Sequence, residues 1–215
     1  MKPAPAPGWT GQEKRRLGRL ADPFGIQAFL DRIPYDDAPG TRSPRWILRE
    51  SKAHCFEGAL FAAAALRFLG HRPLVVDMCA DNDDDHVIAV FRRRGLWGAI
   101  AKSNFTTLRF REPVYRTLRE LVMSYFDVYF NTLGHKSLRS YARPLDLGRF
   151  DRRGWMTTED DIGYIGDVLN GMRHIPLLAP GAVRTLHRVD ARLFRAGMLG
   201  AKASGLYRAK ARIKR

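Results

Sequence analysis

The sequence predicts an α+β fold in which a buried helix that begins with a cysteine packs on a small antiparallel sheet, with further helices towards the C-terminus. Residues 53–69 are rich in alanine and leucine, are closed by Gly70, and carry apolar side chains around almost the whole circumference of a helix, as a buried helix does. Three short apolar runs follow at 73–80, 87–91 and 96–101, and their lengths are typical of strands.

Length and composition limit the class of protein. A chain of 215 residues with 45% hydrophobic residues can build a sizeable core, which excludes wholesale disorder. It contains no apolar run of about 18 residues, so we expect no membrane-spanning helix. Two cysteines exclude a disulfide-rich scaffold, and no hydrophobic signal core follows the N-terminal lysine. We therefore expect a cytoplasmic protein.

The elements before and after the central helix and strands are expected to be as follows. Residues 1–22 are rich in proline, glycine and basic residues, which favours a flexible basic N-terminal arm. Short helical periodicity appears over 23–32. A longer helix is expected over 113–130, with Pro113 in its first turn, and another is expected to run to about residue 170 from an N-cap pattern that begins at Thr157.

The net charge of +15 is concentrated at the C-terminal end. Residues 182–215 carry ten Lys and Arg against one acid, a net charge of +9, whereas the other 181 residues carry +6. We therefore divide the chain into the arm, a core with a helical extension over 23–180, and a basic amphipathic tail over 181–215. The tail shows helical spacing of basic residues on one face and of apolar residues on another: Arg184, Arg188, Arg192 and Arg195, and Leu186, Val189 and Leu193. It could lie on an anionic lipid surface, RNA or an acidic partner, or it could be a solvated helix.

Cys55 and His86 are the candidate catalytic residues. Cys55 opens the central helix, where unpaired amide hydrogens and the helix dipole stabilise a thiolate. His86 lies 31 residues further on, at the start of the second apolar run, and an imidazole is the group that a thiol nucleophile needs to take its proton.

A third residue must orient the imidazole, and Asn104 is the candidate for it. Folding the second and third apolar runs into a hairpin about Arg93 and Arg94 sets His86 roughly opposite Ala101. Asn104 is then within reach of His86, and Lys102 and Ser103 are the neighbouring alternatives.

These residues and their order resemble the transglutaminase-like branch of the papain-like fold over about residues 46–105. The segment 53–60 is similar to the opening of that family's cysteine helix, and 66–73 to the passage from the helix into the next strand. The segment 85–91 is similar to its histidine strand, and 95–97 to the Gly-Trp return of its hairpin.

The resemblance implies a thiol nucleophile at Cys55, a general base at His86 and an orienting residue at Asn104. It implies acyl transfer through a thioester, which is either hydrolysis or transamidation. The substrate would be an amide or a peptide, with proteins among the candidates. We expect no cofactor and no metal. The third residue is usually Asp in this family and lies closer to the tryptophan than Asn104 lies to Trp97, so Ser103 stays an alternative.

Other interpretations of the same residues remain open. A lone buried cysteine is most often a small hydrophobic residue, as we expect of Cys79, and Asn104 alone could be a turn residue. The acidic loop 81–85 is a solvated turn, a selector for cationic substrates that raises the pKa of His86, or a calcium loop. It lacks the glycine and terminal Glu of an EF-hand, and the cysteines and His86 lack the spacing of a zinc site.

Two functions from different classes follow. The first is a transglutaminase-like thiol enzyme. The second is a binding or scaffold protein that keeps the fold without the chemistry and acts through its basic tail on an anionic membrane, nucleic acid or an acidic protein. The second function would place the protein at a membrane surface as a peripheral protein.

Overall fold

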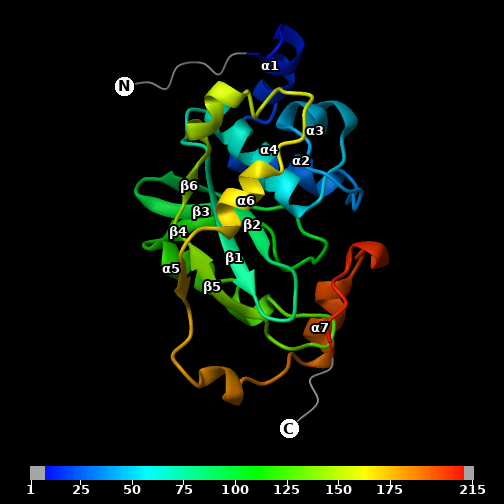
Figure 1. The fold of residues 1–215 in the computed structure, drawn as a ribbon, viewed down its shortest axis with the longest axis vertical. Coiled ribbons are helices and arrows are strands. Elements are labelled where there is room, and N and C mark those ends of the chain that lie inside the picture. Colours follow the sequence, from blue (N-terminus) through cyan, green and yellow to red (C-terminus); the bar gives the residue numbers. More distant parts are fainter. Residues whose placement is uncertain (1–7, 211–215) are drawn as a thin grey trace.

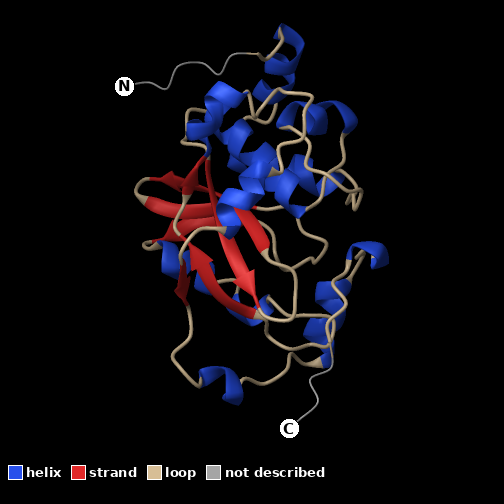
Figure 2. Ribbon diagram, viewed as in Figure 1, coloured by secondary structure: helices blue, strands red, loops and turns tan. Residues whose placement is uncertain are grey.

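The computed structural model describes residues 8–210, and these residues form an α+β fold (Figures 1 and 2). The strands are β1 (Leu74–Ala80), β2 (His86–Arg93), β3 (Leu96–Ile100), β4 (Arg111–Tyr115), β5 (Leu138–Ala142), β6 (Leu145–Asp146) and β7 (His174–Pro176). The α-helices are α1 (Gly11–Gly18), α2 (Pro23–Arg32), α3 (Pro44–Glu50), α4 (Cys55–Phe68), α5 (Leu118–Met123), α6 (Tyr164–Asn170) and α7 (Ala191–Met198). Short 3-10 helices are η1 (Phe126–Val128), η2 (Leu147–Arg153), η3 (Ala182–Thr185) and η4 (Ala203–Gly205).

All seven of these strands join one antiparallel sheet, which confirms the expected α+β class. Their order is β4-β3-β2-β1-β5-β7, and β6 pairs with the other end of β1. The helices α1 to α4 gather on one side of the sheet, where α4 packs on β1 and β2, and α5 lies against β3 and β4 (Figure 1).

Both faces of the sheet are covered, which explains why its central strands read as continuous apolar runs. Along β2, Val87, Ala89 and Phe91 pack into the core shared with the N-terminal helices. The intervening Ile88 and Val90 point to the opposite face, into a second core that includes α5. Alternating residues of a strand point to opposite faces, so a strand buried on both sides needs apolar residues throughout.

The helix α4 begins and ends where the sequence predicts. His54 is its N-cap residue, and the N-terminal end is closed by Glu57, whose carboxylate accepts the His54 backbone N–H at 3.2 Å. At the other end, Gly70 has a φ of 92°, a left-handed conformation that favours glycine. The helix is buried along almost its whole length between these two ends.

The hairpin between β2 and β3 turns one residue later than expected, which shifts the cross-strand partner of each residue by two positions. Arg93 pairs with Leu96, so the turn consists of Arg94 and Gly95, which have φ values of 51° and 82°. Two successive positive φ values define the tight turn that matches the twist of a β-hairpin.

This register corrects the expectation that His86 lies opposite Ala101. The last printed pair of the ladder is Ala89 with Ile100, and the same register, extended beyond it, sets position 103 opposite His86. Ala101 lies instead beside α2, where its backbone N–H and carbonyl bond the side-chain amide of Gln27 at 3.0 and 2.9 Å.

The long helix expected over 113–130 is wrong. Pro113 lies in β4, which is the edge strand of the sheet, a place that a residue without a backbone N–H tolerates. Helix α5 starts later because Thr117 is its N-cap and accepts the Glu120 N–H at 3.1 Å.

The helix expected from about Thr157 begins only at Tyr164. The polar residues before it close loops instead: Asp161 accepts the backbone N–H groups of Thr41 and Gly163, each at 2.7 Å. Asx residues compete in this way with helix formation.

The N-terminal segment differs from a flexible arm over its described residues. Helix α1 begins after Thr10, whose side chain and that of Glu13 form a reciprocal capping box. Leu17 is 1% exposed and packs into the core with Trp9. The expectation for residues 1–7 lies outside the described residues.

The basic tail is not one continuous helix. The 3-10 helix η3 ends at Thr185, and Asp190 starts α7 anew by accepting the N–H groups of Arg192 and Leu193 at 2.8 and 3.0 Å. After α7 the chain, red in Figure 1, rises and turns back, and residues 211–215 lie outside the described part. Over residues 8–210, none of the helices has the length and apolar composition that crossing a membrane requires.

Candidate functional site

Cys55 and His86 line the same small cavity, at the point where α4 and β2 begin. Tyr35, Leu108 and Tyr129 are further lining residues. The cavity has a volume of about 40 Å³, which is room for a water-sized molecule but not for a substrate.

The surroundings of Cys55 hold its thiol in the protonated form. The Tyr35 hydroxyl donates a hydrogen bond to the thiol, and the Phe56 N–H at the start of α4 lowers its pKa, as a helix N-terminus should. Burial outweighs both, and together with the Asp84 carboxylate it raises the pKa of the Cys55 thiol to about 11. In this conformation the helix N-terminus alone does not produce a thiolate.

Tyr35 reaches the thiol because its loop pairs with the residues just before α4. Tyr35 and Ala53 form an isolated parallel bridge, in which the Asp36 N–H donates to the Ala53 carbonyl at 3.1 Å. The sequence offers no periodic signal for this pairing, and Tyr35 was not anticipated as a neighbour of Cys55.

The His86 imidazole is neutral and fixed in one orientation. Its Nε2 lies 3.2 Å from the Leu108 carbonyl oxygen. A carbonyl only accepts, so Nε2 carries the proton and Nδ1 keeps its lone pair. The ring edge packs against Tyr129, with the centroids 6.3 Å apart.

Burial lowers the pKa of His86 to about 4, which corrects the expectation that the acidic loop raises it. His86 is 4% exposed, so the cost of desolvating an imidazolium exceeds the gain from its hydrogen bond to the Leu108 carbonyl.

Asn104 and Ser103 lie at the same cavity, but their hydrogen bonds go elsewhere. Asn104 bonds the backbone of Lys202 and Gly205 through its side-chain amide, and Ser103 Oγ accepts the Phe105 N–H at 3.0 Å. The Leu108 carbonyl takes the place at Nε2 that Asn104 was expected to occupy. A role of Asn104 in orienting His86 stays a prediction.

Lys102, the third side chain considered for this place, points into the core. Its Nζ donates to the carbonyls of Leu30 and Ile33 at the end of α2, at 2.8 and 2.6 Å. It therefore anchors α2 to the end of β3 rather than facing the cavity.

The C-terminal segment closes the cavity from outside, which the sequence did not indicate. Gly205 and Tyr207 line the cavity itself, and Leu206 joins them at its open side. We call residues 202–210 the C-terminal strap.

The acidic loop between β1 and β2 is a structured turn. Asp83 accepts the Ser137 hydroxyl at 2.6 Å, and burial raises its pKa to about 6. Asp85 accepts the Ala80 N–H at 2.7 Å, and Asp84 lines the cavity. Among residues 8–210, no three His, Cys, Asp or Glu side chains are grouped so that they could hold a metal ion.

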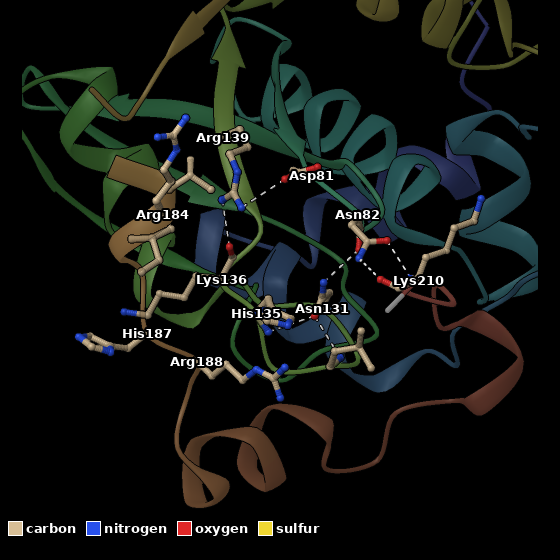
Figure 3. A pocket seen from close by; sticks show the side chains of 13 residues that line it. Asp81, Asn82, Asn131, His135, Lys136, Arg139, Arg184, His187, Arg188 and Lys210 are labelled. Carbon is tan, nitrogen blue, oxygen red and sulfur yellow. Dashed lines mark hydrogen bonds and ion pairs between the residues drawn. The ribbon is translucent and has the colours of Figure 1, made fainter. Parts of the chain in front are cut away.

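A second pocket, of about 500 Å³, lies beyond the acidic loop (Figure 3). Most of its charged side chains are basic, and we call it the basic pocket. Arg184 lies in η3, and His187 and Arg188 come from the segment between η3 and α7. Asn82 bonds Lys210 across the pocket. The remaining lining residues are Asp81, Asn131, Leu133, His135, Lys136, Arg139, Val183 and Leu186.

No protein-family model and no curated protein matches this chain. What the protein does must therefore be inferred from its own residues, above all from those of the cavity at Cys55 and of the basic pocket.

Proposed function

We propose that the protein is a thiol enzyme of transglutaminase-like type, which transfers the acyl group of an amide or peptide through a thioester on Cys55. One observation carries this proposal: Cys55 and His86 share a cavity, and the Leu108 carbonyl leaves the His86 Nδ1 lone pair as the proton acceptor. A nucleophilic thiol and a neutral, oriented imidazole are the two groups that this chemistry requires.

The reaction can be written with these two groups alone. As Cys55 Sγ attacks the amide carbon, its proton passes to His86 Nδ1. The C–N bond then breaks, the imidazolium gives its proton to the leaving amine, and a thioester remains on Sγ. Water or a second amine attacks the thioester, Sγ regains a proton, and an acid or a new amide is released.

Acetylation by p-nitrophenyl acetate tests the proposal, because it reports the thioester directly. The strap covers Cys55, so the full-length Gly205→Val variant is used beside the wild type. The added side chain would meet the Tyr35 ring, because even a Cβ at position 205 would lie 2.8 Å from Tyr35 Cε1. We expect a burst of p-nitrophenolate and one acetyl group on Cys55 in the variant.

Three added substitutions control the experiment. Adding Cys55→Ala or His86→Gln to Gly205→Val should remove the burst, and adding Cys79→Ala should leave it unchanged. Added glycinamide separates transfer, which yields acetylglycinamide, from hydrolysis, which yields acetate. A burst that survives Cys55→Ala, or no acetylation of Cys55 in the Gly205→Val variant, would refute the proposal.

The basic pocket favours a second candidate function, which is binding of a polyanion without chemistry at Cys55. A volume of about 500 Å³ is typical of ligand pockets. Within residues 8–210, neither Arg184 nor Arg188 has an ion-pair partner, so both guanidinium groups are available to an anion. The anionic partner would be a membrane surface with anionic phospholipids or RNA.

Cosedimentation with vesicles of phosphatidylcholine and phosphatidylserine, and titration with single-stranded RNA, separate these two partners. Arg184→Glu with Arg188→Glu should weaken binding to the true partner and reduce its salt dependence. Arg93→Glu with Arg94→Glu, at exposed positions in the hairpin, changes the net charge by the same amount and is the control. Equal binding by the two double variants would exclude the pocket.

A further inference from the structure

Side-chain amides hold the strap by its backbone. Asn104 Oδ1 accepts the Lys202 N–H at 2.8 Å, and Asn104 Nδ2 donates to the carbonyls of Lys202 and Gly205 at 2.9 and 3.0 Å. At the other end of the strap, Asn82 Oδ1 accepts the Lys210 N–H at 2.9 Å and Asn82 Nδ2 donates to the Lys210 carbonyl at 2.8 Å. Each amide therefore pairs with a backbone N–H and a carbonyl, as a neighbouring strand would.

A third side chain holds the middle of the strap in the same way. Thr132 Oγ1 donates to the Tyr207 carbonyl at 3.1 Å and accepts the Ala209 N–H at 3.4 Å. Backbone groups are common to every residue, so Asn82, Thr132 and Asn104 can hold another chain of the same backbone conformation, including the turn of η4, as well as they hold the strap.

The position of Gly205 adds a selective feature to this surface. A Cβ at that position would lie 2.8 and 3.1 Å from Tyr35 Cε1 and Cδ1 and 3.2 Å from Asn104 Nδ2. Real Cβ atoms avoid such distances, so the chain that lies here must carry glycine where it crosses the Tyr35 ring. Tyr35 is also the hydrogen-bond donor to Cys55, so this glycine lies beside the thiol.

Carboxylates add a preference for cations. Lys202 Nζ lies 2.6 Å from Asp37 Oδ1, and together with the Ser204 side chain it lowers the pKa of Asp37 to about 2. Asp84 and Asp85 line the same open surface as Asp37. A segment with a lysine ahead of its glycine therefore fits this surface.

We propose that the C-terminal strap occupies, within its own chain, a peptide-binding groove whose other ligand is a basic segment that adopts the backbone conformation of the strap, with a glycine beside Cys55. This inference rests on the proposed function only in that the groove presents its ligand to the Cys55 thiol. The strap then competes with any ligand that enters the groove. Recognition combines backbone pairing by Asn82, Thr132 and Asn104 with the glycine contact at Tyr35 and the cation contact at Asp37.

Fluorescence anisotropy of a labelled peptide with the sequence of residues 200–210 tests the proposal. The protein is the full-length chain, as wild type and as Gly205→Val, in which the strap no longer fits over Tyr35. A tethered segment has an effective concentration on the order of 1 mM, so we expect the peptide to bind Gly205→Val at least about tenfold more tightly than the wild type. A peptide that carries valine at the position of Gly205 should not bind.

A second displacement variant guards against an effect peculiar to valine. Lys202→Glu sets a carboxylate against Asp37 and should also increase peptide binding, whereas Lys14→Glu, at an exposed position in α1 far along the chain, should not. Equal and weak binding of the peptide to all four proteins, or equal binding of the glycine and valine peptides, would overturn the proposal.

The measurement separates this proposal from the proposed enzyme. Binding needs no thiol, so the peptide should bind Cys55→Ser combined with Gly205→Val as it binds Gly205→Val alone. Binding without acetylation of Cys55 would count only against the enzyme. Acetylation of Cys55 without peptide binding would count only against the groove.

Discussion

Glu57 is the residue on which the start of α4, and with it the position of Cys55, depends most. It is fully buried, and its carboxylate accepts four hydrogen bonds. Three come from Arg42, through its backbone N–H at 2.8 Å, Nε at 2.7 Å and Nη2 at 3.2 Å, and the fourth comes from the His54 N–H. We predict that Glu57→Ala destabilises the fold more than any exposed substitution does.

The magnitude follows from what the substitution leaves behind. Removing one partner of a buried ion pair costs about 3–5 kcal/mol, because the other charge stays without its partner. Arg42 keeps Asp36 at 3.0 Å and is 21% exposed at its side chain, so the lower end of that range applies. We expect the free energy of unfolding to fall by about 3 kcal/mol, and by less in Glu57→Gln, which keeps one acceptor oxygen.

Urea unfolding followed by tryptophan fluorescence measures this loss. With a slope of about 2 kcal/mol per M, a loss of about 3 kcal/mol lowers the midpoint by roughly 1.5 M. Glu50→Ala is the matched control, since Glu50 ends α3 at an exposed position and should stay within about 0.5 kcal/mol of the wild type. A free energy of unfolding of Glu57→Ala within about 1 kcal/mol of that of the control, on the order of the net value of one hydrogen bond, would show that the buried ion pair does not stabilise the start of α4.

Three further predictions concern the core and its titrating groups. Gly58→Ala should lower the free energy of unfolding by about 1–3 kcal/mol despite the better helix propensity of alanine, because its Cβ would lie 2.2 Å from Lys102 Cβ. Gly11→Ala, in the open first turn of α1, should not lower it, and urea unfolding measures both variants. Burial lowers the pKa of Lys102 to about 8, so the unfolded chain binds more protons than the folded one between pH 8 and 10.5. The free energy of unfolding of the wild type should therefore rise across that interval relative to that of Lys102→Met. A difference between the two proteins that stays constant with pH would contradict this prediction. The pKa of His86 is about 4 in the fold against 6.5 ordinarily, so the stability that neutral His86 contributes is complete above pH 6.5 and falls by about 3 kcal/mol as the pH drops towards 4. Plots of the free energy of unfolding against pH for the wild type and His86→Gln should therefore converge in acid. Parallel plots would refute this prediction.

The centre of the fold is predictable because its local signals agree with its packing. The alanine-rich helix with Gly70 behind it, and the apolar runs that became β1, β2 and β3, are buried on all sides. Composition alone then identifies them. The sheet extends further than these strands. β6 and β7 are only two and three residues long, and β5 and β6 pair with β1, which lies far before them in the sequence. Pro113 in β4 favours a helix start by composition.

The candidate site was predictable only in part, for a related reason. Cys55 and His86 lie at the starts of well-marked elements, so their approach follows from the topology. The partners of these two residues come from irregular segments: a hydroxyl from Tyr35 and a backbone carbonyl from Leu108. A backbone carbonyl has no residue type, so no side-chain pattern could have identified the Leu108 contact.

The two candidate catalytic groups are far from proton transfer while the strap is in place. The thiol pKa of about 11 and the imidazole pKa of about 4 lie much further apart than the ordinary values of 9.0 and 6.5. Movement of the Cys55 proton to His86 is therefore less favourable here than between the free side chains. Burial is the first cause of both shifts, and the strap forms one wall of the burying cavity.

Displacing the strap should therefore change the pH profile of Cys55 alkylation. In Gly205→Val we expect the midpoint for reaction with iodoacetamide to move from about 11 towards 9, which raises the thiolate fraction at pH 8 by up to about a hundredfold. Cys79 is the internal control, because burial and Asp85 raise its pKa to about 11 and Cys79 lines neither of the two cavities that the strap residues line. Peptide mapping by mass spectrometry follows both thiols in one sample. An unchanged profile at Cys55, in a variant that binds the peptide, would show that the strap does not set the thiol pKa.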